Sequence, residues 1–112
     1  MDAEEIKQKS VELIKKLSEK IDKCEWRKIV MRDFKGSTQD FILEFKDSGS
    51  VVISRDTISV YTKDSTLVSE YQPTAENGNA YALAVLWGNV CGKIQKPINA
   101  KLGLIITELD KL

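Results

Sequence analysis

Residues 39–61 read QDFILEFKDSGSVVISRDTISVY. Apolar and polar side chains alternate over the first part of this segment, which is the period of a β-strand with one buried face. A polar loop that contains a glycine, at 47–50, separates this part from a second apolar run at 51–55, as in a β-hairpin. The segment therefore predicts two antiparallel strands, at 39–46 and 51–55. In the first strand the residues predicted to face the core are Phe41, Leu43 and Phe45.

The same period of two continues on both sides of this hairpin. One strand is expected before it, at 25–34, and a glycine-serine-threonine turn at 36–38 should connect the two. Two further strands are expected after it, at 57–63 and 67–72, and Pro73 should end the last of them because proline cannot donate to the sheet. Short strands joined by short polar turns predict an antiparallel meander.

Helical periodicity replaces the strand period at both ends of the chain. The segment 3–24 carries one apolar stripe of period near 3.6, and Asp2 is placed to cap its first turn. A second helix should begin at the N-cap Thr74, and Pro97, whose ring clashes with the preceding turn, should break or kink it near Gln95. A last apolar stripe at 98–112 predicts a further helix.

These elements predict a fold class and a single domain. A length of 112 residues, 42% hydrophobic and 30% charged, is typical of one folded globular domain. We expect an α+β fold over residues 1–112: an N-terminal helix, a five-stranded antiparallel meander and two C-terminal helices, the second after the Pro97 break, packed on the sheet. This order is similar to that of several small partner-binding folds, including secretion chaperones, toxin-immunity proteins and phage-encoded inhibitors, although the chain carries no motif of theirs.

The residue types needed for most enzyme sites are missing. The chain has no histidine and only two cysteines, Cys24 and Cys91, which excludes catalytic triads and a four-ligand zinc site of nitrogen and sulfur donors. Asp40 and Glu44 share a strand face, but four strand residues separate them by about 13 Å, beyond the ~5–9.5 Å of glycosidase pairs. Glycine-rich phosphate loops are absent. We therefore expect no enzyme, no catalytic residue, no cofactor and no metal.

Charge and hydropathy bear on location. Seventeen basic and seventeen acidic residues give a net charge of zero, so no overall field attracts nucleic acid or anionic membranes. The first residues are acidic and do not resemble a secretory signal. The densest apolar run, at 80–87, is too short to cross a bilayer. These features favour a cytoplasmic protein without membrane contact.

The remaining feature is apolar surface in excess of what one small core is expected to hide. Exposed patches of that kind mark interfaces, so we expect a non-catalytic protein–protein interaction domain of adaptor, chaperone-like, immunity or inhibitor type. The partner would be another protein, a second copy in a homodimer, or both. The candidate residues lie beside the junction of the first helix with the first strand and on the outward face of the second strand: Trp26, Lys28, Arg32, Asp40, Ile42 and Glu44.

Two other functions fit parts of the sequence. Basic residues gather at the helix–strand junction and indicate a nucleic-acid site, but acidic residues interrupt them and no nucleic-acid-binding motif is present, so we do not expect nucleic acid as the partner. A small-molecule pocket between sheet and helices is the other alternative. Its polar groups would be the hydroxyls of Tyr61, Tyr71 and Tyr81.

Overall fold

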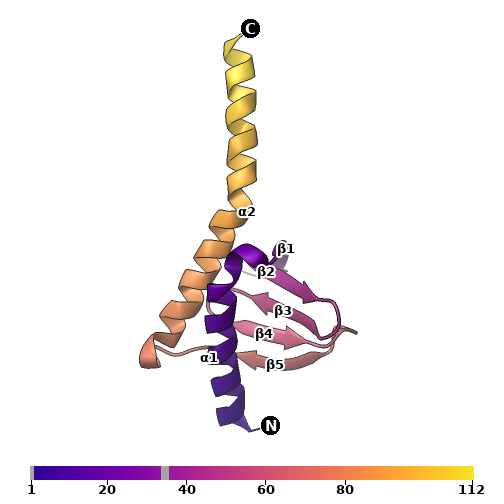
Figure 1. Ribbon diagram of the computed structural model, residues 1–112, viewed down its shortest axis with the longest axis vertical. Coiled ribbons are helices and arrows are strands. Elements are labelled where there is room, and N and C mark those ends of the chain that lie inside the picture. Colours follow the sequence, from indigo (N-terminus) through magenta and orange to yellow (C-terminus); the bar gives the residue numbers. More distant parts are fainter. Residues whose placement is uncertain (1, 34–35) are drawn as a thin grey trace.

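The computed structural model describes the backbone of residues 2–33 and 36–112 and the side chains of residues 2–29 and 39–112. A helix comes first, a five-stranded sheet follows, and a long helix ends the chain, which confirms the predicted α+β class (Figure 1). A short 3₁₀ turn, η1, follows the first helix, and a second, η2, precedes the last helix. The bounds are α1 Ala3–Glu19, η1 Ile21–Lys23, β1 Arg27–Asp33, β2 Gly36–Phe45, β3 Gly49–Ile53, β4 Ile58–Tyr61, β5 Leu67–Tyr71, η2 Glu76–Gly78 and α2 Asn79–Asp110.

The five strands form one sheet in the order β1-β2-β3-β4-β5, and each pairs antiparallel with the next. The predicted meander is confirmed. The turn expected at 36–38 is wrong, because those residues already belong to β2 and pair with the end of β1. The register places Phe41 opposite Ile53, and Ile53 opposite Ile58. Directly opposed residues share a face, so one face of the sheet is continuously apolar.

Both helices cover this inner face and close a single core. Figure 1 shows α1 and the first half of α2 lying side by side against the sheet. Phe45, predicted to face the core, is 42% exposed because it ends β2 opposite Gly49, which offers no side chain to pack against. Among the side chains that the structure describes, the outer face of the sheet contributes none to the apolar core. The buried apolar residues are Ile14, Leu17, Trp26, Phe41, Leu43, Val51, Ile53, Ile58, Leu83, Leu86 and Val90.

The first helix begins where the sequence predicts. The Asp2 carboxylate accepts a hydrogen bond from the Glu5 backbone N–H at 2.8 Å, which caps the first turn. The helix ends at Glu19, short of the expected residue 24, and η1 follows. A side chain from α2 supports this end of the segment. Lys93 Nζ donates to the carbonyl oxygens of Ile21 and Cys24, at 2.8 and 2.7 Å.

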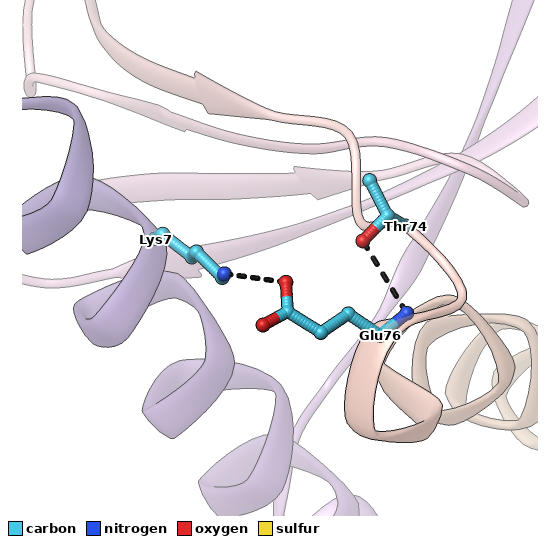
Figure 2. Close-up of polar contacts among 3 residues, drawn as sticks. All are labelled: Lys7, Thr74 and Glu76. Atoms are coloured by element: carbon cyan, nitrogen blue, oxygen red, sulfur yellow. Dashed lines mark hydrogen bonds and ion pairs between the residues drawn. The ribbon is translucent and has the colours of Figure 1, made fainter.

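A polar contact joins α1 to the turn before α2 (Figure 2). Lys7 Nζ donates to the Glu76 carboxylate at 2.7 Å, and the pKa of Lys7 is raised, chiefly by this hydrogen bond. The Thr74 hydroxyl accepts from the Glu76 backbone N–H at 3.4 Å. Thr74 therefore supports η2, and α2 itself begins after Gly78, whose φ is +71°.

The two C-terminal helices predicted from the sequence are one helix in the structure. α2 continues through Pro97 to Asp110. A proline removes one helical hydrogen bond and bends a helix without necessarily ending it, and Figure 1 shows the axis of α2 changing direction between its lower and upper parts. The expected packing of 98–112 on the sheet is also wrong, because every residue from 95 to 112 is exposed.

The molecule is elongated as a result. Its principal extents are 63 × 34 × 33 Å and its Cα radius of gyration is 16.6 Å, whereas a compact chain of this length has a radius of about 13 Å. The second half of α2 accounts for the difference, since it extends beyond the sheet and α1 (Figure 1). Within the residues described, neither helix has the length and hydropathy needed to span a membrane.

Candidate interaction surface

Three of the predicted partner-binding residues lie together on the outer face of β2. Asp40, Ile42 and Glu44 alternate with the buried Phe41 and Leu43, as the strand period indicates. Ile42 is half-buried and lies opposite Val52 in the register. No helix of the described ranges covers this face, so it is a small exposed surface with an apolar centre.

The other three candidates do not join this surface. Trp26 is 8% exposed and belongs to the core, and its indole N–H has no hydrogen-bond partner among the described residues. Lys28 lies opposite Phe41 and therefore on the inner face, at the edge strand β1. The side chain of Arg32 lies outside the described residues. The structure thus gathers only half of the predicted site.

Asp40 lies beside a second carboxylate. Partial burial raises the pKa of the Asp40 carboxyl, and the negative charge of Asp56 raises it further. Both residues border an open hollow of about 610 Å³ near Trp87. The indole N–H of Trp87 donates to the Gln39 carbonyl at 2.9 Å, which fixes the α2 side of the hollow on β2.

The surface that sequence reasoning missed is the second half of α2. We call residues 95–112 the projecting segment; all of them are exposed. The side chains include seven large apolar residues, 46% to 101% exposed, which no other part of the described chain covers. All but Leu104 and Ile106 belong to the stripe that was expected to pack on the sheet. The seven are Ile98, Leu102, Leu104, Ile105, Ile106, Leu109 and Leu112.

A hollow of about 200 Å³ marks the base of the projecting segment. β1 and β2 form one wall of this hollow and one side of α2 forms the other. The wall on α2 is partly apolar, because Ile94 and Ile98 belong to it. The residues around the hollow are Lys28, Gln39 and Phe41 on the sheet and Cys91, Ile94, Gln95, Ile98 and Asn99 on α2.

The metal-ligand types, the cysteines and the tyrosines of the described residues are spread over the fold. Across the described ranges, no group of three or more His, Cys, Asp or Glu side chains is placed to hold a metal ion. Cys24 and Cys91 are both free thiols and half-buried. The three tyrosines do not meet, since Tyr61 points to the outer face, Tyr71 packs against the core and Tyr81 is 75% exposed on α2.

Of the basic residues at the helix–strand junction, Arg27 forms an ion pair with Glu44 on the neighbouring strand. Lys20, Lys23 and Lys28 at the same junction are exposed.

Comparison of the chain with protein-family models, with curated proteins and with solved structures found no match.

Proposed function

We propose that this chain is a non-catalytic protein-interaction domain and that the projecting segment is its main binding element. One observation carries the proposal: seven large apolar side chains lie exposed between residues 98 and 112. Full burial of one such side chain by a partner would contribute about 1.5–3 kcal/mol of favourable free energy. Contiguous exposed apolar surface of this kind marks interaction sites.

The shape of the surface favours a protein as the partner. A single helix that extends from a folded body presents a narrow apolar stripe, and another helix or an apolar groove covers such a stripe well. An adaptor, a chaperone-like protein, an immunity protein and an inhibitor would all work through such a surface. The outer face of β2, with Asp40, Ile42 and Glu44, is a second surface for the same function, because no helix covers it.

We further propose that the protein works in the cytoplasm. Cys24 and Cys91 are free thiols in the structure. Reduced cysteines are the norm in the cytosol, whereas small secreted domains tend to pair theirs.

Site-specific photo-crosslinking in cells tests the interaction function. A benzophenone amino acid replaces Leu109, which is 61% exposed, and in a matched control it replaces Lys63, an exposed residue in the turn between β4 and β5. We expect irradiation to attach a defined protein at position 109 and none at position 63. Equal labelling at both positions, or none at either, would show that the projecting segment is not a binding element.

A further inference from the structure

The exposed apolar side chains of the projecting segment follow a heptad. Five of the seven are separated by four, three, four and three residues, which is the spacing of alternating d and a positions in a coiled coil. The stripe they form is a narrow seam, suited to one other helix, and is narrower than the stripe of a helix that packs on a sheet. We call these five residues the seam: Ile98, Leu102, Ile105, Leu109 and Leu112.

We propose that the seam pairs with the seam of a second copy of this chain, with the two projecting segments antiparallel in a two-stranded coiled coil. The proposal rests on the interaction function above and names its partner. A two-fold symmetric interface must be self-complementary, so that when residue i contacts residue j of the other copy, j contacts i. The seam meets this condition in one register, in which Leu102 of each copy lies beside Ile105 of the other.

Charges beside the seam favour the antiparallel orientation. Lys101 and Glu108 are seven residues apart and flank the seam on the same side, at g positions. In the antiparallel register, Lys101 of each copy lies next to Glu108 of the other, which gives two opposite-charge pairs. In a parallel pair, each Lys101 would instead lie next to Ile106 of the other copy, and no ion pair would form.

The hollow at the base of the projecting segment fits the same register. When Leu102 lies beside Ile105, the far end of one seam, at Leu112, reaches Gln95 of the other copy. Gln95 and Ile98 border the hollow of about 200 Å³ against β1 and β2. An apolar cavity of about 150 Å³ holds a molecule as large as benzene, so the hollow has room for the leucine side chain.

The first measurement is light scattering during size exclusion with the purified chain at tens of micromolar. We expect a mass of twice 12.6 kDa. Leu102→Lys should shift the mass to one chain, since it puts a charge into the seam. Ala100→Lys is the matched control, because Ala100 is exposed on the same turn but lies off the seam, and this variant should remain a dimer. Circular dichroism should show that both variants are folded.

The second measurement tests the orientation. Lys101→Glu and Glu108→Lys should each raise the dimer dissociation constant about tenfold, because each replaces two attractive pairs with repulsive ones. The two changes combined should restore the wild-type constant. If the combined variant is no tighter than the single ones, the antiparallel arrangement is wrong.

The outcomes separate this inference from the function it rests on. A single-chain mass for the wild type, together with a crosslink from position 109 to a different protein, would overturn the self-pairing and leave the interaction function standing. A single-chain mass without any crosslink would overturn both. A dimer that survives Leu102→Lys would place the interface elsewhere and refute the proposal.

Discussion

Gly49 occupies a backbone position that only glycine fits without strain. Its φ is +120°, and a Cβ there would overlap the carbonyl oxygen of Tyr61 on the neighbouring strand β4. The sequence of the loop 47–50 predicts a hairpin between β2 and β3. The close approach of β4 to Gly49 is visible only in the fold. The residue therefore matters for the packing of three strands as well as for the turn.

We predict that Gly49→Ala lowers the free energy of unfolding by about 2–4 kcal/mol, through a strained φ and the clash with backbone. Gly88→Ala is the matched control, since Gly88 lies within α2 and a Cβ there meets nothing within 4 Å. That variant should gain about 0.5–1 kcal/mol from helix propensity. Urea unfolding followed by circular dichroism measures both, and equal effects would contradict the prediction.

Asp40 should make stability depend on pH. Its folded pKa lies above the ordinary value of 3.8 because of burial and of Asp56. The folded state therefore holds the proton more tightly than the unfolded state, and stability falls as the pH rises from about the ordinary value through the raised pKa.

Asp40→Asn should remove this loss of stability at higher pH, because asparagine does not ionise. We expect its urea midpoint to exceed that of the wild type at pH 7 and to match it at pH 3, where the wild-type carboxyl is protonated in both states. The effect should be small, because Asp40 is only partly buried. A difference in midpoint that stays constant between the two pH values would show that the charge is not its cause.

At the scale of elements, α2 is one continuous helix whose two halves have different surroundings. Its first half supplies Leu83, Leu86 and Val90 to the core, each 0% exposed, and its second half supplies nothing. Periodicity predicts an apolar stripe in both halves, so the presence of a stripe does not show which half is covered. The separation comes from the inner face of the sheet, which α1 and the first half of α2 already cover.

Two leucines in α2 test this division. Leu83→Ala should cost about 2–5 kcal/mol, because it leaves a cavity in a closed core. Leu102→Ala should change the stability of the folded body by less than about 0.5 kcal/mol in dilute solution, because Leu102 is 53% exposed and lies far from the core. Thermal melts decide the matter, and a large loss for Leu102→Ala would mean that the projecting segment folds back onto the body.

At the scale of the whole molecule, the chain divides into a compact body and an arm. The body consists of the sheet, α1, the connection at 20–26 and the first half of α2, and it contains every buried apolar residue of the described chain. The arm is the projecting segment. At 1.5 Å per residue its eighteen residues extend about 27 Å, which explains why the longest dimension of 63 Å is nearly twice the other two.

Small-angle X-ray scattering should detect the arm directly. For the Leu102→Lys variant, which we expect to be a single chain, the radius of gyration should lie well above the ~13 Å of a compact chain of this length. The structure gives 16.6 Å for its Cα atoms. Measurement at several concentrations, extrapolated to zero, controls for association. A radius near the compact value would contradict the extended arm.

Much of the fold follows from local sequence. The alternation around Phe41 and Leu43 is enough to predict that strand and its buried face, because a strand has a period of two. The meander follows from several such strands joined by short polar turns. The Asp2 cap is equally local. Of the six candidate site residues, Asp40, Ile42 and Glu44 follow from the same alternation and lie where it places them. The burial of Trp26 does not follow from this alternation, because burial of a large side chain at a junction depends on which elements pack over it.

The sequence by itself determined the order of the helical and extended segments and the absence of histidine chemistry, since these depend on residue identity and short-range spacing. Only the tertiary structure decided which apolar stripes are covered. Coverage depends on the area of the inner sheet face, and that area is shared among all the helices of the chain. The stripe at 98–112 is apolar, as in a helix that packs on another element. It stays exposed because α1 and the first half of α2 already cover the inner face of the sheet.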